Sequence, residues 1–137
     1  MKKQALLELA HQARTYAYAP YSHFQVGAAL LAKSGNIYTG CNIENAAYTP
    51  SNCAERTAFF KAISEGEREF TAIAIVGGPE GKRPDGICPP CGVCRQVMME
   101  FCDPELFEIV LEDSRKEMRT FLLKEILPYG FGPDNLI

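Results

Sequence analysis

Three cysteines and one glutamate constrain the fold of this chain more than any other feature of its sequence. Cys53 is followed two residues later by Glu55, and Cys91 and Cys94 form a CxxC pair much further along the chain. Three thiolates can hold Zn²⁺ in a tetrahedral site and leave its fourth position open for water. A fold that contains such a site must bring the segment around residue 53 against the segment around residue 91.

The local sequence places all three cysteines at the starts of helices. Residues 50–52 (Pro-Ser-Asn) are expected to open a helix that ends near Ser64, and a second helix is expected over about 92–101. Cys53 then lies in the first turn of one helix, while Cys91 and Cys94 lie on one face of the first turn of the other. The partial positive charge of a helix N-terminus favours thiolate over thiol, which suits metal ligands.

Glu55 is expected to act on water and not to bind the metal. A carboxylate beside a zinc site can take a proton from the water and return it later in the reaction. Three cysteines, a glutamate two residues after the first of them, and Pro90 directly before the CxxC pair are together typical of zinc-dependent nucleobase deamination.

The negative charge of three thiolates calls for a cation near the sulfurs. Arg56 follows Cys53 by three residues and shares its helical face, and Arg95 follows Cys91 by four residues. Either guanidinium could donate hydrogen bonds to sulfur and offset the charge. The alternative for each is an ordinary solvated surface arginine.

Two other roles for the cysteines compete with a catalytic zinc site. Cys88 could add a fourth thiol and close the shell, because it forms a second CxxC with Cys91. The two prolines between them favour polyproline II, which separates these Cα atoms by about 9 Å, against about 5 Å for the helical pair. Cys91 and Cys94 are therefore the better placed pair to bind one metal ion. A redox pair would leave Glu55 without a role, so catalytic zinc is favoured.

The rest of the chain alternates helices and strands. A helix is expected from about Lys2 to Tyr18, and another closes the chain over 120–127. The expected strands are 25–32, 37–41, 71–76, 107–111 and a short one around 117–119, with a loop rich in Gly and Pro over 77–90. Helices interleaved with strands predict an α/β fold in three layers, α/β/α, with the sheet covered on both faces. At 137 residues, the chain is expected to form a single domain, 1–137.

Composition narrows the classes of partner. The net charge is −3, without the basic surplus that is usual in nucleic-acid binding. No run of apolar residues approaches the ~20 of a membrane span, and Glu8 interrupts the apolar start of the chain, so we expect no signal peptide. We expect a cytoplasmic protein with no membrane or nucleic-acid partner. Its six cysteines are then ligands or free thiols, with Cys41 and Cys102 as buried bystanders.

Five stretches in one order carry a resemblance to a known family. They are residues 17–22 (AYAPYS), 24–29 (FQVGAA), 40–46 (GCNIENA), 53–56 (CAER) and 90–96 (PCGVCRQ). With them the chain resembles the small homotetrameric cytidine deaminases over nearly its whole length. The resemblance implies a mixed five-stranded sheet between helices. It also implies hydrolytic deamination of cytidine and 2′-deoxycytidine to uridine and 2′-deoxyuridine with release of ammonia, a reaction of pyrimidine salvage.

The resemblance also assigns the reacting groups. It implies one Zn²⁺ per subunit, held by Cys53, Cys91 and Cys94, with Glu55 as the proton shuttle. It makes Arg56, and not Arg95, the partner of the thiolates.

For the substrate, the resemblance implies that Asn42 and Glu44 bind the ribose 3′-hydroxyl and that the backbone of Ala54 contacts the base. Phe24 is expected to pack against the pyrimidine. From the residues alone, Asn42 would be a turn residue and Phe24 a core aromatic.

Neighbouring subunits of a homotetramer are implied to complete each active site. The resemblance places Tyr48 and the aromatic near the C-terminus, here Phe131, in these shared contacts. The chain departs from the family pattern at residues 77–88, because this segment is longer than in the family. The resemblance assigns no role to Cys88.

Other functions remain as alternatives. One is deamination of a nucleoside antibiotic or of a cytosine within a polynucleotide. The acidic balance argues against the polynucleotide, and the pair of Asn42 and Glu44 suits a free ribose. The other is a zinc-stabilised interaction domain without activity, which requires a fourth protein ligand. The sequence does not distinguish a preference for ribose from one for deoxyribose.

Overall fold

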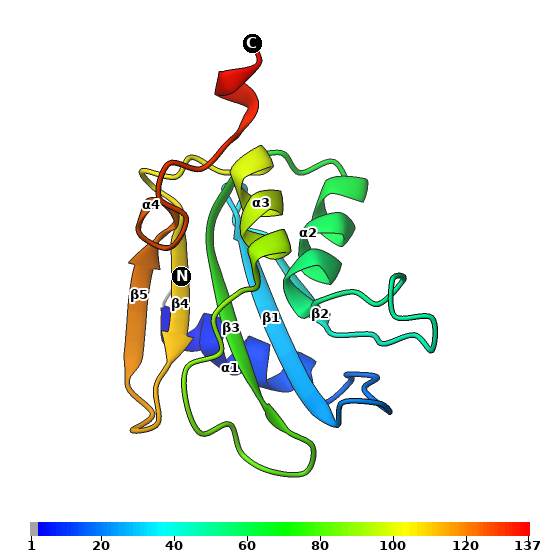
Figure 1. Ribbon diagram of the computed structural model, residues 1–137. Coiled ribbons are helices and arrows are strands. Elements are labelled where there is room, and N and C mark those ends of the chain that lie inside the picture. The colour runs from blue at the N-terminus through cyan, green and yellow to red at the C-terminus, as the bar shows by residue number, and fades with distance from the viewer. Residues whose placement is uncertain (1–2) are drawn as a thin grey trace.

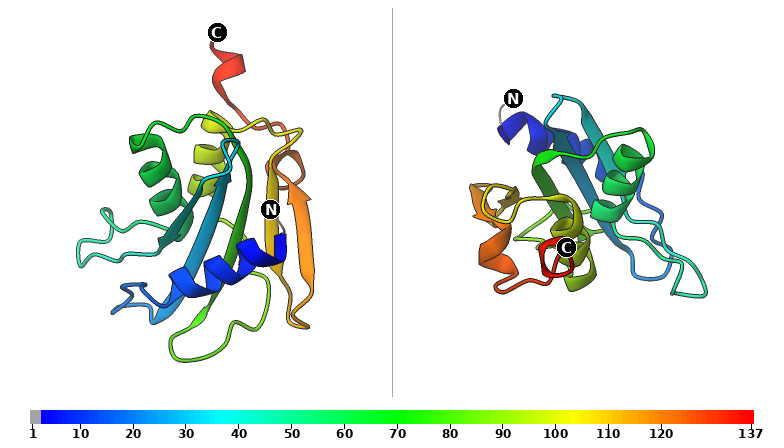
Figure 2. Two further views of the ribbon diagram at one scale, coloured as in Figure 1. Left: turned by 180° about the vertical axis from the view of Figure 1, so that it is seen from behind. Right: turned by 90° about the horizontal axis from the view of Figure 1, so that it is seen from above.

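The computed structural model describes residues 3–137 and contains a single mixed sheet of five strands. The strands are β1 (Phe24–Ala32), β2 (Ile37–Cys41), β3 (Phe70–Pro79), β4 (Glu108–Glu112) and β5 (Met118–Leu122), in the order β2-β1-β3-β4-β5. Helix α1 (Lys3–Arg14) covers one face, and α2 (Ala54–Ser64) and α3 (Gly92–Phe101) cover the other (Figure 1, Figure 2). The short α4 (Leu123–Ile126) and a 3₁₀ turn (Pro133–Asn135) follow β5. The expected α/β/α class with a mixed five-stranded sheet is confirmed.

The strand directions bring the starts of α2 and α3 to the same edge of the sheet. β1 is antiparallel to both β2 and β3, so β2 and β3 run in the same direction. The chain leaves β2 toward α2 and leaves β3 toward α3, and α3 serves as the crossover to the parallel strand β4. Both helices therefore begin beyond the carboxyl ends of their preceding strands.

Each face of the sheet has its own apolar core. Ile73 and Ile75 of β3 pack toward α2 and α3, whereas Ala74 and Val76 of the same strand pack toward α1. This alternation follows from the two-residue period of a strand. Phe59 of α2 is buried in the larger core, among the rings of Phe70, Phe101 and Phe107.

The first helix is shorter than the sequence predicts. The expected start at Lys2 lies outside the described residues, and α1 ends at Arg14 instead of near Tyr18. The N–H groups of Thr15 and Tyr16 bond to carbonyls three residues back, which forms a turn. The N–H of Tyr18 then donates to the carbonyl of Asn42 at 3.0 Å, so pairing across the molecule replaces the last predicted turn of the helix.

The third strand runs further than predicted, because Gly77 to Pro79 continue β3 instead of opening the loop. They pair with Val26, Gln25 and Phe24 of β1. Glycine is needed at 77 because a Cβ there would lie 2.6 Å from the sulfur of Cys88. The two glycines that suggested a loop are therefore strand residues over which other groups pack closely.

The predicted last helix over 120–127 is wrong in its first half. Thr120 and Phe121 pair with Val110 and Ile109, which extends β5 to Leu122. Threonine and phenylalanine both fit a half-buried sheet surface. Only Leu123–Ile126 remain helical. No helix in the part of the chain that the structure describes has the length and apolarity needed to cross a bilayer.

Gly27 allows α1 to lie directly on β1. A Cβ at this position would be 2.0 Å from the carbonyl oxygen of Ala10 and 2.5 Å from the backbone nitrogen of Arg14. We expect Gly27→Ala to lower the free energy of unfolding by about 3 kcal/mol or more, because the backbone of the helix must move. Gly92→Ala is the matched control, since no atom lies within 4 Å of a Cβ there. Equal urea midpoints for the two variants would contradict this packing.

Candidate active site

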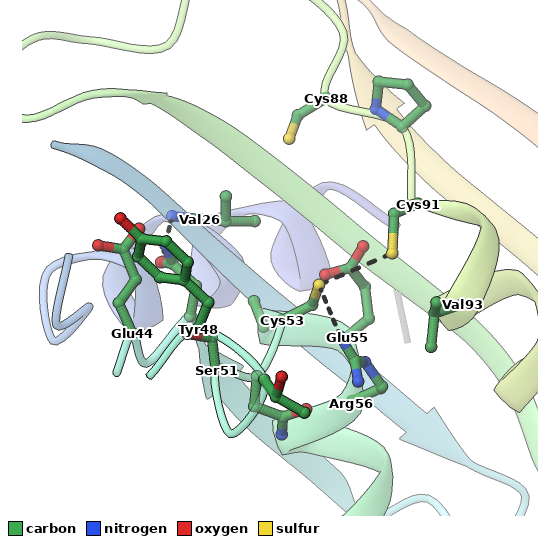
Figure 3. A pocket seen from close by; sticks show the side chains of 15 residues that line it. Val26, Glu44, Tyr48, Ser51, Cys53, Glu55, Arg56, Cys88, Cys91 and Val93 are labelled. Atoms are coloured by element: carbon green, nitrogen blue, oxygen red, sulfur yellow. Dashed lines mark hydrogen bonds between the residues drawn. The ribbon is translucent and has the colours of Figure 1, made fainter. Parts of the chain in front are cut away.

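The three cysteines meet where α2 and α3 begin. Cys53 and Cys91 are the N-cap residues of the two helices, with extended backbones, and so precede the first turn in which they were predicted to lie. Cys94 lies in the first turn of α3 and is 1% exposed. All three sulfurs lie within 4.8 Å of one another. Figure 3 shows Cys53 and Cys91, whose sulfurs are 3.7 Å apart.

The surroundings of Cys53 favour a negative charge on its sulfur. A hydrogen bond from Cys94, followed by those from Arg56 and Cys91, lowers the pKa of Cys53 to about 5. The pKa of Cys94 rises, because its proton is held against the sulfur of Cys53. Zinc ligation requires deprotonated thiols, and a group of three sulfurs with one acidic member and two helix N-termini suits that requirement.

Arg56 is the arginine that contacts a ligand sulfur. Its Nη2 donates to the sulfur of Cys53 at 3.2 Å, and its Nε is buried without a hydrogen-bond partner among residues 3–137. Thiolates close to this buried donor would compensate it. Arg95 instead donates to the carbonyls of Pro90 and Ile126, at 2.7 and 2.5 Å, and so connects α3 to the segment before it and to α4.

Cys88 stands apart from the other three thiols. Among residues 3–137, the cluster that could hold a metal ion consists of Cys53, Cys91 and Cys94. Cys88 comes from the loop after β3 and lines the cavity in front of them (Figure 3). The donor set is therefore three sulfurs, the number found in zinc sites that keep one position open.

Glu55 reaches the same cavity from the first turn of α2. Its side chain is almost completely buried, at 4% exposure. Burial, with a smaller contribution from the charge of Cys53, raises the pKa of its carboxyl to about 7. A carboxyl group with a pKa near neutrality can both accept and donate a proton at the pH of a cell.

The cavity in front of the thiols has a volume of about 540 Å³, which is in the range of small-molecule sites. Asn42, Glu44, Tyr48 and Ala54, four of the predicted substrate contacts, line it. Six further residues line the cavity that were not predicted as site residues, although Val26 and Val93 lie within two of the stretches that carry the resemblance: Val26, Thr49, Ser51, Asn52, Pro89 and Val93.

Asn42 and Glu44 are held in place by hydrogen bonds to the chain. The amide of Asn42 accepts from the N–H of Val26 and donates to the carbonyl of Phe24, both at 2.8 Å, so it also fills the structural role expected from its place after a strand. The carboxylate of Glu44 accepts from the hydroxyl of Ser22 and from the N–H groups of Tyr21 and Ser22. The bond from the Ser22 hydroxyl contributes most to lowering the pKa of Glu44.

The predicted aromatic contacts are distributed differently. Tyr48 is 73% exposed at the cavity and has a left-handed backbone, with φ of 64°. Phe24 is 40% exposed, so it is not the core aromatic expected from the residues alone; its ring lies near Gly77, as Cys88 and Val26 do, but it does not line the cavity. Phe131 is 57% exposed near the C-terminus, where its carbonyl accepts from Gln96, and lies outside the cavity of its own chain.

Known proteins with this arrangement are deaminases. The family model described as the cytidine and deoxycytidylate deaminase zinc-binding region matches residues 1–109. The chain belongs to the cytidine deaminase family. It is 46% identical to a cytidine deaminase of Sporosarcina psychrophila, over 99% of this chain and 96% of the relative. It is 49% identical to that of Halalkalibacterium halodurans, over 99% and 98%.

Solved structures agree with this assignment. The crystal structure of a cytidine deaminase from Burkholderia pseudomallei superposes with a TM-score of 0.86 at 47% identity, over 96% of this chain and 100% of that one. The cytidine deaminase family consists of zinc hydrolases, so the chain is a zinc-dependent enzyme whose substrate is a nucleoside. The three clustered thiols provide a donor set for that ion.

Zinc content tests the ligand set. We expect Cys53→Ala to reduce bound zinc from one per chain to a small fraction, because two sulfurs remain where three converge. Cys88→Ala and Cys41→Ala remove a thiol outside the cluster and should keep the metal. Atomic absorption on the dialysed proteins measures all three. Full zinc in Cys53→Ala, or its loss in Cys88→Ala, would contradict the assignment.

The raised pKa of Glu55 predicts a pH-dependent stability. The folded carboxyl binds its proton more tightly than the ordinary value of 4.5 allows, so this stabilisation is present at low pH and is lost as pH rises through about 7. In zinc-free protein, Glu55→Gln should become more stable relative to wild type between pH 5 and pH 8.5, by up to about 3 kcal/mol. Urea unfolding at both pH values measures the change, and the exposed Glu65→Gln is the control. A gain that is the same at both pH values would refute the burial argument.

Proposed function

We propose that this protein hydrolyses cytidine and 2′-deoxycytidine to uridine and 2′-deoxyuridine with release of ammonia, as a step in pyrimidine salvage. The observation that carries the proposal is the buried carboxyl of Glu55, which lines the same cavity as Cys53 and Cys91 of the thiol cluster. Family membership supplies the reaction class, and the cavity volume of about 540 Å³ suits a nucleoside.

The proposed mechanism assigns the proton transfers to one residue. Zinc, when bound by Cys53, Cys91 and Cys94, would lower the pKa of a water molecule and so supply a nucleophile at neutral pH. Glu55 accepts the proton of the water that attacks C4 of the cytosine ring. The same carboxyl then protonates N3, takes a second proton from the hydroxyl now attached to C4 and passes it to the departing amino group, so that the C4–N bond breaks, ammonia leaves and C4 becomes a carbonyl.

Several groups would orient the nucleoside. The N–H of Ala54 lies in the first turn of α2, where helix N–H groups have no partner within the helix, so it can donate to the base. Asn42 and Glu44 would bind the ribose 3′-hydroxyl. The amide of Asn42 makes one bond at each end within the chain, and a second hydrogen and a second lone pair remain for the sugar.

We also propose that residues 1–137 form one catalytic domain that acts in the cytoplasm as a homotetramer. All six cysteines are free, as the reducing cytoplasm favours. The exposure of Tyr48 at the cavity mouth, and of Phe131 away from the cavity of its own chain, supports sites completed by a neighbouring subunit. Light scattering that gives the mass of a monomer would reject this part of the proposal.

Turnover tests the role of Glu55 directly. We expect Glu55→Gln to keep its zinc but to lose cytidine turnover by about 10³-fold or more, because the amide cannot carry the proton. The loss of ultraviolet absorbance as cytidine becomes uridine measures the rate. Glu65→Gln makes the same change at the exposed end of the same helix and should remain active. A Glu55→Gln variant within a factor of about 10 of wild type would remove Glu55 from this role.

A further inference from the structure

Cys88 lines the cavity, and neither the zinc site nor the proposed reaction gives it a role. Its sulfur packs over Gly77, where a Cβ would lie 2.6 Å from it. The ring of Phe24 and a methyl group of Val26 would each lie 3.1 Å from the same Cβ position. These neighbours place the Cys88 sulfur against the carboxyl end of β3, on the side of the cavity that Val26 also lines (Figure 3).

Two cationic side chains, Arg14 and Lys116, donate hydrogen bonds to the segment that precedes Cys88. Arg14 of α1 donates to the carbonyls of Gly78, Pro79 and Lys82, at 2.9, 2.8 and 2.9 Å. Lys116, between β4 and β5, donates to the carbonyl of Pro84 at 2.9 Å. No local pattern in the sequence indicates that these two cations bind this segment. These charged donors hold the part of the chain between β3 and Pro84, four residues before Cys88.

Two apolar residues line the cavity next to Cys88: Pro89 follows it in the chain, and a methyl group of Val26 lies near the same point over Gly77. We call Val26, Cys88 and Pro89 the apolar wall. Burial raises the pKa of Cys88 to about 12, so its thiol is neutral at pH 7. A neutral thiol behaves as a small hydrophobic group.

The chemistry of cytosine determines which part of the ring faces this wall. In the proposed reaction N1 carries the sugar, C2 carries an oxygen, N3 meets Glu55 and C4 is attacked. The edge formed by C5 and C6 has only C–H bonds and gains nothing from a polar partner, so it belongs against the apolar wall.

We infer that Cys88 determines substrate specificity by limiting the size of the substituent on C5 of the pyrimidine. The inference rests on the proposed function, because it concerns the same cavity and reaction. A sulfur that fills the corner over Gly77 leaves room for hydrogen at C5 and less room for a methyl group. Replacing it by a smaller side chain opens that space, and replacing it by a larger one closes it further.

The test compares cytidine with 5-methylcytidine. We expect Cys88→Ala to raise the ratio of kcat/KM for 5-methylcytidine to that for cytidine by about 10-fold, which is the scale on which a hydrophobic pocket discriminates one methyl-sized group. Cys88→Ile should lower the ratio. Cys88→Ser keeps an atom at the γ position and should change the ratio less than Cys88→Ala does. Cys41→Ala removes a thiol outside the cavity and should leave the ratio at the wild-type value.

Three results would overturn the inference. The first is an unchanged ratio in both Cys88→Ala and Cys88→Ile. The second is loss of zinc in Cys88→Ala, which would make Cys88 a ligand. The third is wild-type protein, loaded with zinc, that does not deaminate cytidine, and this result would reject the proposed function as well. The first result, obtained with active wild-type protein, rejects the role of Cys88 alone.

Discussion

The site depends on two helices that begin at the same edge of one sheet. Because β2 and β3 run in the same direction on either side of β1, the chain leaves both strands at the same edge and starts α2 and α3 there. Cys53 and Cys91 cap these helices, and their sulfurs lie 3.7 Å apart. The arrangement of strands thus brings Cys53 next to Cys91 and Cys94, although these two parts of the metal site are far apart in the chain. Close backbone contacts at Gly27 and at Gly40, where a Cβ would lie 2.5 Å from the carbonyl oxygen of Ala54, hold α1 and α2 against that sheet.

Charge balance explains why these side chains gather around the thiols. Three thiolates with a divalent ion leave an excess of negative charge, and two helix N-termini and the guanidinium of Arg56 oppose it. Glu55 lies beside this negative charge and is buried, and both conditions favour its protonated form. The Glu55 carboxyl, buried next to the Cys53 thiolate, therefore has a pKa near neutral pH and can exchange its proton there.

Local patterns in the sequence predicted most of the fold and the residues that the fold brings together, Cys53, Cys91 and Cys94 with Glu55 beside them. Strand β2 and helix α3 have the predicted bounds, because turn residues and helix starts mark them clearly. The prediction failed where tertiary pairing overrides local preference. Gly77 and Gly78 suggested a loop, but the partner strand β1 keeps them in β3, and Thr120 and Phe121 joined β5 because β4 lies beside them. The roles of Arg14 and Ser22 could not be predicted, since each contacts residues that are distant in sequence.

The most direct test of this account is the coordination of zinc in the wild-type protein, measured by X-ray absorption at the zinc edge. The account predicts three sulfur neighbours and one oxygen or nitrogen neighbour, because Cys88 faces the cavity and stays outside the cluster of Cys53, Cys91 and Cys94. Four sulfur neighbours would mean a closed structural site, and would contradict both the open position for water and the role of Glu55.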